Sequence, residues 1–381
     1  MAKSTHKPNL QILQGGNEST MSEKDKADQF LDTFLAQLPD KGNPLPFLEA
    51  IKAEFGQDPS WQAVMPRLDR LIEEAKAKQQ NKPRPTAGAR EEFASRCNEK
   101  IEEADQLIAR KDMAGAAKII FPLLEEFEMN GFYDDKKGME LCSPCAPYEF
   151  PLFLSRHYSL YDNDNYEFVE IPVSTLYAKM GAIVWAADNE EMASDLFEQS
   201  IAWNPVSAPT YLMYAALEQS YKHYDKMLTM TKAAHQCAVQ TEIIAHCFLN
   251  YGTYYQHRKK PLYALAMFRM ARKYFGEQKD ENLDQTIREC EKNLGKIISE
   301  TDSENEAREI CRRLEVSFGI SEFVASVICT SVEEGIKGDA QLPLETFGPM
   351  LEKLNYEGDE AEIIELIAQT RQKYAAYKEK H

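Results

Sequence analysis

The sequence contains one pair of cysteines at a spacing that could do chemistry, Cys142 and Cys145 in the tetrapeptide CSPC. Two thiolates in such a turn can bind one zinc ion, and they can form a redox pair when a helix N-terminus lowers the pKa of one thiol. Zinc requires two further ligands, but the sequence has no second Cys-x-x-Cys and no His-x-x-x-His. We therefore expect a turn with two ordinary thiols and no cofactor. A metal-binding or thiol-redox protein is the alternative.

The sequence shows no local motif of a catalytic centre. It has no Gly-x-Gly-x-x-Gly, no P-loop, no Gly-x-Ser-x-Gly and no His-Glu-x-x-His. His246 and His257 lie eleven residues apart on one predicted helix, which is too far for both to bind one metal ion. We therefore expect no catalytic residue and a protein that is not an enzyme.

The chain of 381 residues is acidic, with 62 aspartates and glutamates against 44 lysines and arginines and a net charge of −18. Such a surface repels the phosphates of nucleic acid and of anionic lipid. The basic run from His257 to Lys260 is too short to reverse this, so we expect neither nucleic acid nor membrane as a partner. Because the sequence shows neither a signal peptide nor a membrane-length apolar run, we expect a cytoplasmic protein with reduced cysteines.

Helical periodicity dominates the chain and predicts an all-α protein, because sustained two-residue alternation is missing. Within it we expect a short helix from Pro151 to Leu160, an extended stretch before Pro172, and a C-terminal part that folds independently. The predicted parts are a disordered arm over residues 1–21, a helical N-terminal module over 22–76, a linker over 77–88, a helical solenoid over 89–300 with an insertion over 131–172, and a helical C-terminal module over 301–381.

Four residues between Ser174 and Ser207 have the types and spacing of a packed pair of antiparallel helices. Gly181 and Ala193 are small enough to let two helix axes approach closely where the helices cross. Phe197 fills the groove beside that crossing, and Pro205 ends the second helix. This spacing predicts a unit of 34 residues, which is the length of a stacked helical repeat.

The same template fits further parts of the chain. It recurs with Gly252, Ala264, Phe268 and Ala271, and a weaker copy lies over residues 208–240. The weaker copy departs at Glu218, where an aromatic residue is usual, and at Met227, where a small residue is usual. Residues 89–128 predict a fourth pair, with Ala116 or Ala117 at the close crossing and a kink at Pro122. Residues 282–300 predict an amphipathic helix that caps the array.

These residues resemble the tetratricopeptide repeat family over roughly residues 89–300. The runs LFEQSIAWNPV and LNYGTYY, which start at Leu196 and Leu249, are also similar to a group of uncharacterised bacterial repeat proteins. The resemblance implies a helical solenoid scaffold, flanked here by small helical modules, with no established activity.

In such a solenoid, the first helix of each pair lines the concave side. The side chains predicted there mix apolar, aromatic and amide groups, which suits an extended peptide. They are Thr175, Lys179, Trp185, Leu212, Gln219, His246, Asn250, Thr253, Gln256 and His257. Trp185 is the exception in this set, because an aromatic residue at helical spacing is more often a packing residue of the core than the wall of a pocket. The sequence therefore predicts a non-enzymatic scaffold that binds a protein or peptide in this groove, with self-association as a further alternative.

Overall fold

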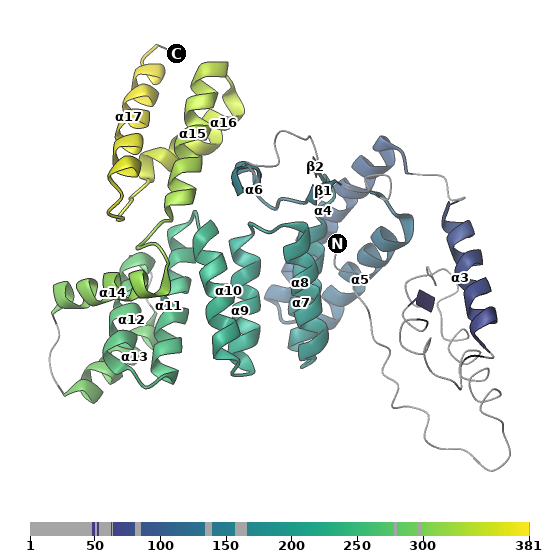
Figure 1. Cartoon of the computed structure of the whole chain (residues 1–381), viewed down its shortest axis with the longest axis horizontal. Coiled ribbons are helices and arrows are strands. Elements are labelled where there is room, and N and C mark those ends of the chain that lie inside the picture. Colours follow the sequence, from purple (N-terminus) through teal and green to yellow (C-terminus); the bar gives the residue numbers. More distant parts are fainter. Residues whose placement is uncertain are drawn as a thin grey trace. The chain divides into compact units, whose positions relative to one another are not determined.

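The computed structural model describes residues 48–49, 52, 62, 64–80, 85–133, 139–156, 166–277, 280–295 and 299–380. The predicted disordered arm over 1–21 and most of the predicted N-terminal module over 22–76 lie outside these residues. Over the described residues the chain is almost wholly helical, as the sequence predicts, with two short strands (Figure 1). None of the described helices combines the length and the apolar character that crossing a membrane requires.

The helices follow one another along the chain with short connections. Their bounds are α3 Met65–Gln80, α4 Ala87–Ala109, α5 Met113–Asn130, α6 Glu149–Arg156, α7 Val173–Ala186, α8 Glu190–Trp203, α9 Ala208–Ser220, α10 Tyr224–Cys237, α11 Thr241–His257, α12 Pro261–Phe275, α13 Glu281–Leu294, α14 Glu300–Leu314, α15 Glu322–Gly338, α16 Gln341–Lys353 and α17 Ala361–Lys378. Helix α3 therefore covers the first four residues of the linker predicted over 77–88, and α4 covers the last two.

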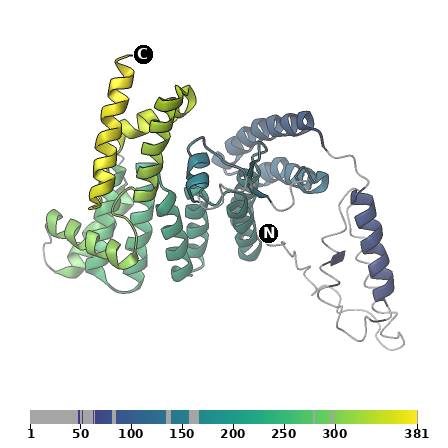
Figure 2. The ribbon, with the colours of Figure 1, turned by 45° about the horizontal axis from the view of Figure 1, so that its top comes forward.

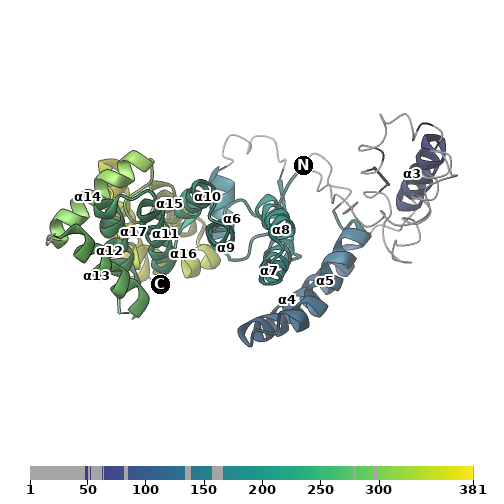
Figure 3. The ribbon, with the colours of Figure 1, turned by 90° about the horizontal axis from the view of Figure 1, so that it is seen from below.

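The central helices form the repeat array. Each of α7, α9 and α11 packs against the helix that follows it, and α9 also contacts α7 and α11. Figure 1 shows these helices standing side by side, and Figure 3 shows the same row nearly end-on. The arrangement is the stack of antiparallel helix pairs that the 34-residue unit predicts.

The two repeat glycines lie where the helices of a pair touch. A Cβ atom on Gly181 would lie 3.1 Å from the ring of Phe197, and one on Gly252 would lie 2.4 Å from the ring of Phe268. Both rings are buried. The glycine thus makes room for the phenylalanine sixteen residues later, so small and large residues face each other across the pair.

The middle pair solves the same packing problem with different residues. At the positions equivalent to Gly181, Ala193 and Phe197 it has Ala215, Met227 and Thr231, and all three are fully buried. Met227 supplies bulk where the other pairs have alanine, and Thr231 is small where they have phenylalanine. The predicted departure at Met227 is therefore a redistribution of volume inside the same interface.

The turns inside the pairs repeat as well. Asp188, Lys222 and Lys259 each follow the first helix of a pair and have φ of 59°, 65° and 57°. Lys111, in the turn between α4 and α5, has φ of 63°. This left-handed residue lets the chain reverse after a helix. Helix α8 ends at Trp203, two residues before Pro205, as predicted.

Contacts divide the chain into two compact units, one of Met1–Glu103 with Lys118–Lys137 and one of Ala104–Ala117 with Gly138–His381. In the first unit, the stacked rings of Phe93 and Phe132 lie 4.8 Å apart. Of the two alanines predicted at a close crossing, Ala116 is the fully buried one. Helix α5 runs through Pro122 as one element.

The insertion carries the only strands among the described residues. Strand β1, Glu140–Cys142, pairs in parallel with β2, Tyr166–Phe168, which agrees with the predicted extended stretch. Helix α6 begins at Glu149, two residues before its predicted start. The strands and α6 bring Cys142, Phe153 and their neighbours into the core of the second unit.

The C-terminal helices are not independent of the array, and this prediction was wrong. One cluster of buried apolar residues joins α10, α11 and α12 with α14, α15, α16 and α17, and α14 packs on α12 beside the predicted cap helix α13. His235 of α10 contacts the carbonyl oxygen of Gly319, and the Ser321 hydroxyl donates to the carbonyl of Gln236. Helix α15 then packs against α16 and α17, which Figure 2 shows beside it. Only two residues of α13, Leu283 and Cys290, are buried.

We expect the glycine contacts to be testable by alanine substitution. An alanine in a helix is normally more stable than glycine by about 0.5–1 kcal/mol. Gly252→Ala should instead destabilise the protein by about 1–3 kcal/mol, since the new methyl group overlaps Phe268. Gly181→Ala should cost less, because its contact is looser. Urea unfolding measures both, and Gly88→Ala is the control, since a Cβ there meets nothing within 4 Å. Equal stability of all three variants would contradict the packing account.

Candidate functional site

The side chains predicted to line the concave groove differ in how accessible they are. Three of the ten, His246, Gln256 and His257, are exposed, and the other seven are partly buried. Trp185 belongs to the partly buried set, and its indole Nε1 donates to the Ser220 hydroxyl over 3.2 Å. It therefore serves in packing between α7 and α9 and still presents one face outward.

Several predicted groove residues already have partners inside the protein. Lys179 forms an ion pair with Asp105, and the Asn250 amide donates to the Thr231 hydroxyl over 3.0 Å. The Thr175 hydroxyl lies 3.1 Å from the Cys145 sulfur, and the Thr253 hydroxyl donates to the carbonyl of Leu249. These groups are consequently less available to a peptide backbone than their sequence positions suggest.

The two histidines predicted for the groove contact aromatic rings. His257 stacks on Tyr224 with ring centroids 3.8 Å apart, and His246 meets Phe275 edge-on at 5.0 Å. They lie eleven residues apart on α11, so they do not share a site. The exposed part of the predicted groove is thus concentrated on α11, with Gln256 beside His257.

The two cysteines of the CSPC turn sit in different surroundings. Cys142 is fully buried, and Cys145 is exposed although its sulfur contacts Thr175 and, at 3.7 Å, the Asn204 amide. Burial and the nearby Glu149 carboxylate raise the pKa of Cys142 to about 12, and the same causes raise the pKa of Cys145. Both thiols are therefore protonated at neutral pH, which does not suit a nucleophile or a redox pair.

Beside this turn, Glu149 is a buried carboxylate with its own set of donors. It is 1% exposed and accepts hydrogen bonds from the backbone amide of Cys145 at 2.6 Å and from the Asn204 amide at 2.7 Å. Burial raises the pKa of Glu149, and these hydrogen bonds oppose the rise. The carboxylate fastens the start of α6 to the end of α8, so its role is structural.

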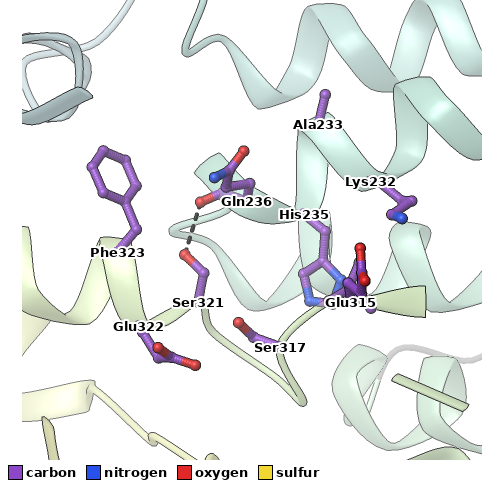
Figure 4. Close-up of a pocket in the computed structure, with 10 residues that line it drawn as sticks. Lys232, Ala233, His235, Gln236, Glu315, Ser317, Ser321, Glu322 and Phe323 are labelled. Atoms are coloured by element: carbon purple, nitrogen blue, oxygen red, sulfur yellow. Dashed lines mark hydrogen bonds between the residues drawn. The ribbon is translucent and has the colours of Figure 1, made fainter. Parts of the chain in front are cut away.

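A cavity of about 410 Å³ opens where the array meets the C-terminal helices (Figure 4). Its walls come from α10, from the loop that joins α14 to α15 and from the first two residues of α15. Figure 4 shows His235 and Gln236 facing Ser317 and Ser321 across this space. The lining residues are Lys232, Ala233, His235, Gln236, Glu315, Val316, Ser317, Ser321, Glu322 and Phe323.

His235 is the titratable group with the most burial in this wall, and both of its ring nitrogens are occupied. Nδ1 lies 3.1 Å from the Tyr251 hydroxyl, and Nε2 lies 2.7 Å from the carbonyl oxygen of Gly319. Since a carbonyl only accepts, Nε2 carries the hydrogen and Nδ1 accepts from Tyr251. The ring is neutral and each of its two nitrogens has a hydrogen-bond partner. It therefore holds the loop before α15 in place and does not serve as a general base.

A second cavity, of about 600 Å³, lies on the neighbouring side of the same junction, and we call it the junction cavity. Ile244, Ile320 and Ile328 form an apolar wall and are almost fully buried. Amide and hydroxyl side chains stand among the other lining residues. The complete lining is Val239, Gln240, Thr241, Ile244, Lys273, Tyr274, Ile320, Ile328, Glu345, Thr346, Pro349, Met350, Lys353, Leu354, Asn355 and Glu357.

Sequence reasoning missed the junction cavity because its residues come from five separate stretches of the chain. No fixed spacing connects Ile244 of α11 with Ile328 of α15. One signal was available: Val324, Ile328 and Val332 form an apolar stripe on α15 that needs a partner surface outside the C-terminal helices.

The comparison with known proteins returned neither a matching family model nor a matching curated protein.

We expect His235 to make the protein acid-labile. Burial lowers its pKa from an ordinary value of 6.5 to about 4. In the unfolded chain His235 therefore binds a proton below about pH 6.5. In the folded protein it binds one only below about pH 4. The contribution of His235 to the free energy of unfolding is therefore fully present above pH 6.5. It falls by about 1.4 kcal/mol per pH unit as the pH drops from 6.5 to 4. Urea unfolding between pH 4 and 8 should show this loss in the wild type.

The non-titrating variant His235→Gln should lose much of that pH dependence, while the exposed-histidine control His246→Gln should keep it. An unchanged slope in His235→Gln would contradict the assignment.

Proposed function

We propose that this protein is a non-enzymatic helical-repeat scaffold of the tetratricopeptide type that binds a peptide segment of a partner protein. The observation that carries the proposal is the junction cavity, whose volume of about 600 Å³ falls in the range of ligand-binding clefts. It is formed by the array together with the C-terminal helices. A scaffold that binds a partner in a preformed apolar cleft requires no catalytic residues.

The chemistry of the junction cavity favours an extended peptide. Apolar walls take side chains, and the amides of Gln240 and Asn355 with the hydroxyls of Thr241 and Thr346 offer donors and acceptors to a peptide backbone. Helix α11 begins at this edge, and no side chain caps its first turn. Its first backbone N–H groups are therefore further donors at the rim.

The charges around the junction cavity favour an uncharged segment. Two lysines, Lys273 and Lys353, are balanced by Glu345 and Glu357. Lys273 pairs with Glu357 over 2.7 Å, so this part of the rim is neutralised internally. A peptide with one or two aliphatic side chains and no charge at its centre meets these conditions best.

Two observations support a scaffold over the thiol alternative. The thiols of Cys142 and Cys145 have raised pKa values, and His235 has no free ring nitrogen. The exposed residues on α11, with Gln256 and His257, are a second surface for the same partner and serve as the comparison in the test.

Selection from a displayed library of random peptides tests the proposal. The wild-type protein should enrich peptides with an aliphatic centre, and synthetic copies should bind with micromolar Kd. Thr346→Trp places an indole in the junction cavity and should weaken binding at least about tenfold, equivalent to 1.4 kcal/mol. Thr301→Trp adds the same ring at an exposed position of α14 and should leave the Kd unchanged. Calorimetry measures each Kd, and thermal melting confirms that both variants fold.

Two results would overturn parts of the proposal. If no peptide is enriched, peptide binding fails as the function. If the selected peptides bind Thr346→Trp normally but lose affinity for Gln256→Ala, the site lies on the predicted concave groove instead.

A further inference from the structure

One carboxylate occupies a core position of the array. Glu218 of α9 stands at the position that is Val184 in the first pair and Tyr255 in the third, and it is 2% exposed. Burying a charged carboxylate is unfavourable unless positive or donor groups surround it. The contacts of Glu218 should therefore show which groups stabilise this buried carboxylate.

Two further potential metal ligands, Glu190 and His223, converge on this carboxylate. The Nδ1 atom of His223 lies 3.1 Å from Oε2 of Glu218 and also 3.1 Å from Oε1 of Glu190. The ligand atoms all lie within 4.8 Å of one another, and this is the one such group of three among the described residues. Only the contact to Glu218 has hydrogen-bond geometry. Since Nδ1 carries at most one hydrogen, the ring cannot satisfy both carboxylates.

The other oxygen of Glu218 is held separately. The Lys226 ammonium lies 2.8 Å from Oε1 and 4.7 Å from the centre of the Tyr214 ring. This contact fixes the orientation of the carboxylate and leaves Oε2 facing His223 and Glu190. Ligating carboxylates commonly have such a partner on the oxygen that does not bind the metal.

From this geometry we infer that Glu190, Glu218 and His223 bind one zinc ion, with solvent completing the coordination. Bonds of about 2.0–2.1 Å in a tetrahedron place ligand atoms about 3.3–3.4 Å apart. The two distances of 3.1 Å from His223 are close to that edge and need only a small adjustment. Imidazole and carboxylate are ligands that zinc accepts.

The proposed ion would connect neighbouring repeats. Glu190 is the first residue of α8 in the first pair, whereas Glu218 and His223 belong to the second pair. Zinc would tie the start of α8 to the turn between α9 and α10. The nearby Lys226 repels a cation, so we expect micromolar affinity and a stabilising role for the ion.

Titration of the chelator-treated protein with Co²⁺ and with Zn²⁺ tests this inference. Wild-type protein should bind one ion per chain and develop visible cobalt bands without thiolate-to-cobalt charge transfer, which excludes the eight cysteines as ligands. Saturating zinc should raise the Tm by several degrees. Glu190→Gln and His223→Asn should each weaken zinc binding at least tenfold and abolish the shift in Tm.

The matched controls change neighbouring or equivalent side chains outside the cluster. Glu191→Gln alters the next residue of the same helix turn, and His246→Asn alters an exposed histidine, so both should bind zinc like the wild type. The inference is overturned if the wild type binds no metal at 100-fold excess of zinc, since the cluster is then an ion-pair network. Equal binding by Glu190→Gln and Glu191→Gln overturns it as well. Neither result bears on peptide binding in the junction cavity.

Discussion

The structure depends on how closely the two helices of each repeat can approach. In the first and third pairs, a glycine on the first helix lies directly against a phenylalanine ring of the second, at Gly181–Phe197 and Gly252–Phe268. The contact is local in sequence, because both residues belong to the same 34-residue unit. It is also strict, because interiors are packed without spare volume. The middle pair keeps the same interface by moving bulk from Thr231 to Met227, which shows that the summed volume matters more than the identity of each residue.

The same scaffold tolerates polar groups in its core where each one has a specific partner. Glu149 takes amide donors from the CSPC turn and Asn204, His235 connects Tyr251 with the loop before α15, and Glu218 meets Lys226 and His223. Each group links elements that the apolar core alone would hold in less defined positions. Hydrogen bonds and ion pairs of these groups therefore connect one repeat to its neighbour, or connect the array to the insertion and to the C-terminal helices.

Stacked helix pairs leave two open faces and two ends, so their functions are usually those of surfaces. One end of this array is covered by α13, α14 and the C-terminal helices, and the cover is imperfect. The spaces left at this boundary are the junction cavity and the cleft beside His235. They combine apolar walls with amides, hydroxyls and charged side chains of both signs. This chemistry is the basis on which we propose the binding of a peptide segment.

The sequence alone determined the all-α class, the length of the repeat unit and the residues at its helix crossings. These features depend on contacts within one unit, and such contacts leave a regular spacing of Gly181, Ala193, Phe197 and Pro205. The sequence also predicted the extended stretch before Pro172 that contains strand β2. Tertiary structure decided the rest. The union of the C-terminal helices with the array core, the junction cavity between Ile244 and Ile328, and the convergence of Glu190 on His223 all join residues from different units. No spacing rule connects such residues, because their distance in space depends on how whole helices stack.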